Sequence, residues 1–282
     1  MFIIYNFFLL LILIFSPIII ITRIFLGKED QYRFKEKFGF YSKNNNIKDT
    51  VWIHGASVGE ILSIVPVIRK FEEDKKIRKI LITSSTTSSS YIFSKFKFKK
   101  TIHQFYPYDL NFITKHFINH WKPKVAIFVD SEVWPNMFNN LHKKKIPLIL
   151  LNARITNKSF KKWKYFPEFS KNIFNKITMA LPQNTETKKY LKSLGAKNIK
   201  FLGNIKFFGN TNKKKKENTN LKRQFSNKKI LCAASTHQKE EIFIARVHKE
   251  LKPEIKNLIT VIIPRHINRK NEIIKELKNL NL

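Results

Sequence analysis

Short apolar runs alternate with longer amphipathic segments along most of this chain, and the pattern predicts an α/β protein. The apolar runs are nearly continuous, which is typical of strands buried on both faces of a parallel sheet. The amphipathic segments between them are typical of helices that cover such a sheet. In the first part of the chain, the predicted strands are 51–54, 79–84, 102–106, 125–129, 148–151 and 178–181, and the predicted helices are 58–71, 111–120, 135–143 and 185–194.

The pattern stops at a polar stretch, 210–220, and then begins again. The lysine run 213–216 within this stretch is typical of a solvated linker between domains. Two strand–helix units follow, which is too few for a self-sufficient doubly wound domain, so we expect the second domain to be partial. Its predicted strands are 229–234 and 258–263, and its predicted helices are 238–251 and 268–277.

The N-terminal segment 2–21 is almost wholly apolar and predicts a membrane anchor. Twenty helical residues span about 30 Å, which is enough to cross the hydrocarbon core. Basic residues follow at once and none precedes, so the positive-inside rule predicts that the rest of the chain is cytoplasmic. A cleaved signal peptide would need a basic start and a small-residue cleavage site, and both are missing. The basic residues that follow are Arg23, Lys28, Arg33, Lys35 and Lys37.

These features together predict five segments. The first is a single-pass anchor, and the second is a basic juxtamembrane segment suited to an anionic leaflet. The third and fifth are the two α/β domains, separated by the linker. The predicted boundaries are 1–22, 23–48, 49–209, 210–227 and 228–282.

The charge balance is unusual but does not decide the function. The chain has 54 Lys and Arg against 20 Asp and Glu, a net charge of +34, which favours polyanionic partners. The lysines are scattered, and the chain is also rich in Ile, Phe and Asn, so drift in nucleotide composition explains the bias equally well. The single cysteine, Cys232, indicates a reducing compartment, and its apolar neighbours predict that it is buried.

The stretch from Trp52 to Glu60 carries the most specific chemistry. It predicts a strand, a glycine-bearing turn and the first turn of a helix, so Glu60 follows the carboxyl end of a strand, where open α/β sheets bind ligands. A carboxylate there is suited to take a proton from a substrate hydroxyl. The spacing of Ser57 and Glu60 also fits a helix capping box, and on spacing alone both interpretations remain open.

Similar polar segments follow other predicted strands, and each is weak by itself. A Ser/Thr-rich run, 83–90, is either a hydroxyl-rich loop facing a sugar or a solvated loop. The remaining motifs are Glu132-x-Trp134-Pro135-Asn136, Asn152-Ala153-Arg154, Gly203-Asn204-x-Lys206, Ser235-Thr236-His237 and Pro264-Arg265-His266.

In this order, and together with His54-x-x-Ser57-Val58-Gly59-Glu60, these motifs resemble the Kdo (3-deoxy-D-manno-octulosonic acid) transferases of Gram-negative envelope synthesis. The resemblance runs from the anchor to about Arg269. It implies a GT-B-like glycosyltransferase with a Rossmann-like acceptor domain, a second Rossmann-like domain that is incomplete here, and an N-terminal transmembrane helix in the bacterial inner membrane. The implied reaction is an inverting transfer of Kdo from CMP-Kdo to the lipid A precursor lipid IVA, with no cofactor and no metal.

The resemblance also implies roles for individual residues. Glu60 matches the general base, whereas Glu132 and Lys206 match residues that stabilise the transition state. Pro264 and Arg265 match part of the CMP site, where an arginine suits a phosphate. The expected substrate-binding positions are Ser57, Gly59, Asn204, Ser235, Thr236, His237, Pro264 and Arg265.

The second domain of the family continues further and carries a Gly-rich loop and an Asn…Glu motif that complete the nucleotide site. This chain ends at Leu282, before either. An inactive or split remnant that binds acidic glycolipid is therefore the alternative expectation. A basic nucleic-acid-binding protein is a third class, but no basic face with stacking aromatics and no such module is recognisable, so no nucleic acid is expected as a partner.

Overall fold

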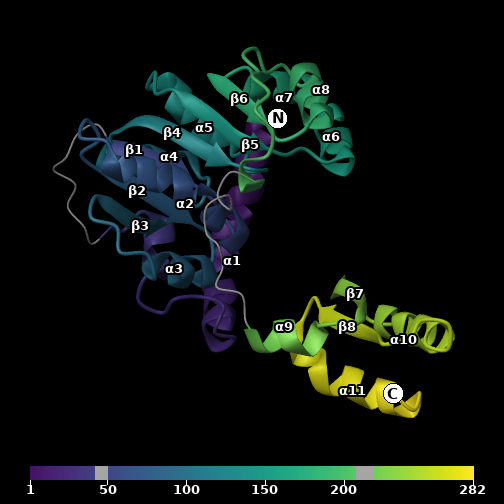
Figure 1. The fold of residues 1–282 in the computed structure, drawn as a ribbon. Helices are drawn as coiled ribbons and strands as arrows, with labels where there is room; N and C mark the ends of the chain where they lie inside the picture. Colours follow the sequence, from purple (N-terminus) through teal and green to yellow (C-terminus); the bar gives the residue numbers. More distant parts are fainter. Residues whose placement is uncertain (42–49, 208–218) are drawn as a thin grey trace. The chain divides into compact units, whose positions relative to one another are not determined.

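The predicted strands form two parallel sheets in the computed structural model, one in each of two units of the chain, Met1–Asn212 and Lys213–Leu282 (Figure 1). The structure describes residues 1–41, 50–207 and 219–282. The first half of the predicted linker, 210–218, therefore lies outside the described residues. Its described part contains a short helix, α9 (Thr219–Phe225).

The sheet of the first unit has six strands in the order β3-β2-β1-β4-β5-β6, all parallel. In this doubly wound order, the direction of winding reverses between β1 and β4, and ligands bind at the carboxyl ends of the two strands that flank such a switch point. The strands are β1 (Thr50–His54), β2 (Ile80–Ser84), β3 (Thr101–Phe105), β4 (Pro123–Val129), β5 (Leu148–Ala153) and β6 (Met179–Pro182).

The strands β1, β2, β4, β5 and β6 send alternate side chains to two apolar cores, one on each face of the sheet. On one face, Ile53 and Ile127 pack with residues of α2 such as Ile64. On the other, Trp52 and Phe128 pack with residues of α4, α5, α7 and α8. Burial on both faces explains why the strands read as continuous apolar runs. The helices of this unit are α1 (Phe2–Phe25), α2 (Val58–Glu73), α3 (Thr87–Ser94), α4 (Asn111–Trp121), α5 (Pro135–Lys143), α6 (Asn157–Lys164), α7 (Pro167–Phe174) and α8 (Thr185–Ser193).

The Ser/Thr-rich run is not a loop, because most of it is the end of β2 and the start of α3. Thr86 is the N-cap of α3, and its hydroxyl accepts a hydrogen bond from the amide of Ser89 at 3.2 Å. Serine and threonine favour this position because they satisfy amides that the first turn of a helix leaves free. Both interpretations of the run as a loop were therefore wrong.

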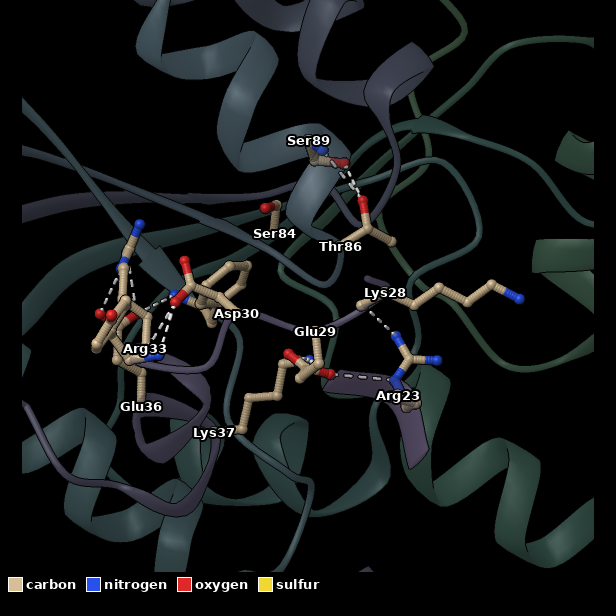
Figure 2. A network of polar contacts seen from close by, with 12 residues as sticks. Arg23, Lys28, Glu29, Asp30, Arg33, Glu36, Lys37, Ser84, Thr86 and Ser89 are labelled. Atoms are coloured by element: carbon tan, nitrogen blue, oxygen red, sulfur yellow. Dashed lines mark hydrogen bonds and ion pairs between the residues drawn. The ribbon is translucent and has the colours of Figure 1, made fainter. Parts of the chain in front are cut away.

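A clasp of ion pairs joins the segment after α1 to the edge of the sheet (Figure 2). Glu29 is buried and accepts from Lys37 at 2.7 Å and from Arg23 at 3.1 Å. Glu36, in the 3-10 helix η1 (Phe34–Phe38), pairs with Arg33 at 2.7 Å and accepts the amide of Phe105 in β3 at 2.8 Å. The clasp therefore satisfies backbone at the edge strand, where unpaired amides would otherwise remain.

Three of the cations in the predicted basic segment form the ion pairs of this clasp. Arg23, Arg33 and Lys37 are engaged inside the protein, and Lys37 is buried. Lys28 and Lys35 are exposed. Residues 42–48 of the predicted segment lie outside the described residues.

Helix α1 has the length and composition of a candidate membrane span, at a mean hydropathy of 2.7. Pro17 lies inside it and provides no amide for the carbonyl of Leu13. The hydroxyl of Ser16 donates to that carbonyl instead, at 2.6 Å. The two residues that interrupt the apolar run here therefore compensate for each other, and the helix continues to Phe25.

The second unit has a two-stranded parallel sheet of β7 (Lys229–Thr236) and β8 (Leu258–Pro264), with α10 (Glu240–Leu251), the 3-10 helix η3 (Ile267–Arg269) and α11 (Lys270–Asn279). Most of β7 is exposed, including Ile230 and Cys232, so the prediction of a buried cysteine was wrong. Ala245 and Ile273 are the buried apolar residues among the described residues of this unit.

We expect Glu36→Ala to lower the free energy of unfolding by about 2–4 kcal/mol, because the change leaves the amide of Phe105 without its acceptor and Arg33 without its partner. Urea denaturation gives this quantity. Glu73→Ala, at the exposed C-terminus of α2, is the matched control and should stay within about 0.5 kcal/mol of the wild type. Equal stability of the two variants would contradict a structural role for the clasp.

We also expect the amides of β7 and β8 to exchange hydrogen much faster than those of β1 and β4. The reason is that two strands with few buried apolar contacts open at low free-energy cost. Hydrogen exchange read by mass spectrometry compares the two sheets in one sample. Similar protection of both sheets would show that the second unit is as stable as the first.

Candidate active site

Glu60 lies in the first turn of α2, directly after the turn that follows β1. Ser57 is the N-cap and accepts from the amide of Glu60 at 3.3 Å, and its hydroxyl donates to the Glu60 carboxylate at 3.0 Å. The other carboxylate oxygen accepts from the amide of Ala56 at 2.7 Å. The capping interpretation therefore holds, but it leaves the half-buried carboxylate at the ligand-binding edge of the sheet.

Two glycines shape the space around this carboxylate. A Cβ on Gly55 would lie 3.2 Å from the Cβ of Glu60, so glycine lets the turn pass this close without displacing Glu60. A Cβ on Gly59 would meet no atom within 4 Å, although glycine costs a helix about 1 kcal/mol relative to alanine. Contacts within the protein do not explain Gly59, and the space beside it is open to a ligand.

Glu132 follows β4, the strand next to β1, and is held by two donors. Its Oε2 atom lies 3.1 Å from Nε2 of His54 and 2.8 Å from Nε1 of Trp134. His54 ends β1 and is fully buried, and its Nδ1 atom lies 2.9 Å from the hydroxyl of Thr83. Trp52 donates to the same hydroxyl at 2.9 Å. Nδ1 also lies 3.2 Å from the carbonyl oxygen of Thr83, and Nε2 carries the proton that binds Glu132.

The histidine is a site residue that sequence reasoning missed. His54 was part of the motif but received no role. The available signal was its position as the last residue of a buried strand, where an imidazole needs two partners. Its ring also stacks on Tyr106, with centroids 3.9 Å apart, which fixes its orientation.

The two carboxylates have their pKa values moved in opposite directions. Burial, and then the nearby charges of Glu132 and Asp130, raises the pKa of Glu60 against the hydrogen bonds from Ser57 and Ala56. Burial also acts to raise the pKa of Glu132, but the hydrogen bonds from His54 and Trp134 and the charge of His54 bring it below its usual value. The pair therefore contains one carboxylate suited to accept a proton and one that stays ionised.

Lys206 reaches the same edge from the segment after β6. Its Nζ atom lies 3.7 Å from Asp130, which follows β4 directly. The amide of Lys206 donates to the side chain of Asn204 at 3.0 Å, and the amide of Ile205 donates to Asn152 at the end of β5 at 3.1 Å. These bonds attach the 3-10 helix η2 (Ile205–Phe207) to the sheet edge and support the half-exposed lysine.

In the second unit, two predicted segments meet at the carboxyl edge of the small sheet. Thr236 pairs with Pro264, and the amide of Arg265 donates to the carbonyl of Thr236 at 3.0 Å. Thr236 is buried and its hydroxyl donates to Glu241 at 2.8 Å, so it supports the turn. Ser235, His237 and Arg265 are exposed at this edge.

The predicted residues therefore form two groups. Ser57, Gly59, Glu60, Glu132, Asn204 and Lys206 belong to the sheet edge of the first unit, and Ser235, Thr236, His237, Pro264 and Arg265 belong to that of the second. Within the described ranges, no group of three or more His, Cys, Asp and Glu residues is placed to hold a metal ion.

A family model described as 3-deoxy-D-manno-octulosonic-acid transferase (kdotransferase) matches residues 32–209, which include the whole sheet edge of the first unit. This chain belongs to the Kdo transferase family. A 3-deoxy-D-manno-octulosonic acid transferase of Rickettsia bellii is 34% identical over 274 residues, covering 96% of this chain and 65% of the relative. The corresponding protein of Haemophilus influenzae is 29% identical over 279 residues, which cover 95% of this chain and 65% of that protein.

This member of the Kdo transferase family spans about half to two thirds of the length of its curated relatives, since matches to other Rickettsia transferases cover 50% of them. Among solved structures, a putative UDP-N-acetylglucosamine 2-epimerase from Listeria monocytogenes aligns with a TM-score of 0.58 at 15% identity, over 82% of this chain and 65% of that one. Such a likeness shows the fold alone, and it confirms the predicted α/β, GT-B-like class.

We expect His54→Phe to raise the pKa of Glu132, because the change removes the hydrogen bond and the charge that lower it. Since the Glu132 charge raises the pKa of Glu60, that pKa should fall wherever Glu132 becomes protonated. Carboxyl-carbon NMR titration follows both groups, and Glu72, whose pKa is lowered by bonds to Thr101, Lys99 and Lys100 and not by His54, is the internal control. Unchanged titration of Glu132 would contradict the proposed control by His54.

Proposed function

We propose that this chain is a glycosyltransferase that transfers Kdo from CMP-Kdo to the lipid A precursor lipid IVA in lipopolysaccharide core synthesis. The observation that carries the proposal is the pair Glu60 and Glu132 at the switch point between β1 and β4, with pKa values moved apart. Membership of the Kdo transferase family supports the same reaction.

In the proposed reaction, Glu60 takes the proton of an acceptor hydroxyl as its oxygen bonds to the anomeric carbon of Kdo. The bond from that carbon to the phosphate oxygen of CMP breaks, and CMP leaves with the electron pair. Attack from the face opposite the leaving group inverts the anomeric configuration. A raised pKa suits Glu60 for this role, since a base is most effective near the working pH.

Glu132 and Lys206 act on the charge that develops during the transfer. The transition state resembles an oxocarbenium ion, and the ionised Glu132 stabilises positive charge at its carbon. Lys206 reaches out from its contact with Asp130 and balances negative charge near the leaving group. Ser57, Gly59 and Asn204 shape the acceptor side around these groups.

The donor contacts proposed for the second unit are the exposed groups at the carboxyl edge of its sheet. Arg265 is suited to bind the phosphate of CMP, beside His237 and Ser235. Thr236 and Pro264 hold the turn that presents them. We also propose that the chain is held at the bacterial inner membrane, with its units on the cytoplasmic side, where CMP-linked sugars are supplied.

The alternative function is binding of acidic glycolipid without catalysis. The two-stranded sheet of the second unit and the partial coverage of the relatives favour it. The two functions share the acceptor site and differ in the chemistry of Glu60.

We expect Glu60→Gln to lower transfer of Kdo from CMP-Kdo to lipid IVA by about 10²- to 10⁴-fold, because glutamine cannot accept the proton. Glutamine still accepts from the amide of Ala56, so the helix start and the thermal midpoint should be preserved. Glu73→Gln, on the same helix, is the matched control and should transfer Kdo like the wild type.

Near-normal transfer by Glu60→Gln would refute the catalytic role. No transfer by the wild type, together with equal binding of lipid IVA by the wild type and Glu60→Gln, would establish the alternative function.

A further inference from the structure

Helix α1 is attached along its length to the first unit. Its docked positions recur every three to four residues and so form one face of the helix. They contact the loop before α4, the start of α5 and α7. The docked residues are Phe2, Tyr5, Asn6, Leu9, Leu13, Ser16 and Ile20.

The attachment is polar at the N-terminal end of the helix. The hydroxyl of Tyr5 donates to Asp109 at 2.8 Å, and the side chain of Asn136 donates to Asn6 at 2.7 Å. Asp109 is buried and also accepts the amides of Asn136 and Met137, at 2.9 and 2.8 Å. A satisfied buried network of this kind fixes the position of the helix end.

The rest of the helix surface is apolar and exposed. Ile3 is 84% exposed, Ile14 68% and Phe25 86%. Continuous apolar surface of this extent is characteristic of a site that contacts a membrane or another protein. The other exposed members are Ile4, Phe7, Phe8, Leu10, Ile12, Phe15, Ile18, Ile19 and Ile21.

These contacts are incompatible with a helix that crosses the bilayer alone. From Phe2 to Ile20 the docked face is about 27 Å long, nearly the thickness of the hydrocarbon core. A crossing would carry Tyr5 and Asn6 to the far side, and the polar surface of the first unit would have to follow them into lipid. We propose that α1 lies in the plane of the inner membrane surface, with its docked face on the first unit and its apolar face in the cytoplasmic leaflet.

Cations at both ends of α1 favour an anionic lipid surface as the occupant of the apolar face. At the N-terminal end, the ammonium of Lys176 lies 5.9 Å from the ring centroid of Phe2. At the other end, the exposed Lys28 follows the helix, and Arg23 in the last helical turn is paired with Glu29. A helix in the interface brings both groups to the same leaflet, as in other amphipathic membrane helices.

This inference rests on the proposed function, because it relates the membrane surface to the proposed catalytic residues. Asn136 holds Asn6 and belongs to the segment that contains Glu132 and Trp134. The lipid chains of a glycolipid acceptor would therefore stay in the leaflet beside α1 while its sugar reaches Glu60. The tests below measure topology and lipid binding, so their outcome does not depend on catalysis.

The first test locates the N-terminus in cells. In a Cys232→Ser background, one cysteine is inserted after Met1, and a membrane-impermeant maleimide is applied to spheroplasts, to inverted inner-membrane vesicles and to detergent extracts. We expect labelling in inverted vesicles and in detergent but not in spheroplasts. Labelling in spheroplasts would establish a crossing, and labelling in detergent alone would place the helix end inside the bilayer; either result overturns the proposal.

The second test identifies what covers the apolar face. Ile3→Ser, Phe7→Ser and Ile14→Ser are combined, and binding of the purified chain to phosphatidylglycerol-containing vesicles is compared with binding to phosphatidylcholine vesicles. We expect the triple variant to bind at least about tenfold more weakly, and the wild type to prefer the anionic vesicles and to lose affinity in high salt. Circular dichroism checks that the fold is kept, since none of the three residues belongs to the docked face.

The matched control combines Ile230→Ser, Phe243→Ser and Ile267→Ser, three exposed apolar residues of the second unit, and should bind vesicles like the wild type. Equal binding by the α1 triple variant and the wild type would overturn the proposal. So would a lipid-free dimer of the wild type that the α1 changes abolish, because a second copy would then be the occupant.

Discussion

The candidate site at the sheet edge of the first unit depends on a buried chain of hydrogen bonds that runs across the middle of the sheet. It starts at the indole of Trp52, passes through the hydroxyl of Thr83 to the imidazole of His54, and ends at the carboxylate of Glu132. Each group is buried or nearly so, and each satisfies the next. The chain links β2, β1 and the segment after β4, so it fixes the position and the charge state of one carboxylate at the switch point. The pKa of Glu60 depends partly on this arrangement, since the charge of Glu132 adds to the effect of burial in raising it.

Much of the fold could be predicted because the sheet is buried on both faces. An apolar run such as 125–129 has no polar interruption when both faces are covered, so every strand was found to within a few residues. Helix α3 was missed because serine and threonine are poor formers of a helix interior, although Thr86 starts this helix by capping it. The exposure of Cys232 in β7 was unexpected, because an apolar run does not reveal whether another layer covers it.

The candidate site was only partly predictable, because strand order can be inferred from the sequence but the contacts between individual side chains cannot. Glu60 and Glu132 each follow a strand, and parallel strands bring their carboxyl ends to one edge, so their meeting follows from topology. Which donor faces Glu132 depends on the register of β1 with β2 and β4, and no local motif contains that information. Local sequence likewise does not show which charged side chains are buried in ion pairs and which are exposed. Lys37 and Lys28 look alike in the sequence, yet one is buried against Glu29 and the other is exposed.

Asn136 shows how one side chain can connect two parts of the proposed function. Its amide group holds Asn6 of α1 and the carbonyl of Asp109, while its backbone starts α5 directly after Glu132 and Trp134. The position of α1 is therefore tied to the segment that carries Glu132 by a hydrogen bond between partly buried side chains. An enzyme whose acceptor is anchored in lipid needs a fixed distance between the membrane surface and its catalytic base. A helix bound along its whole length provides that distance, whereas a helix joined only by a flexible connection would not.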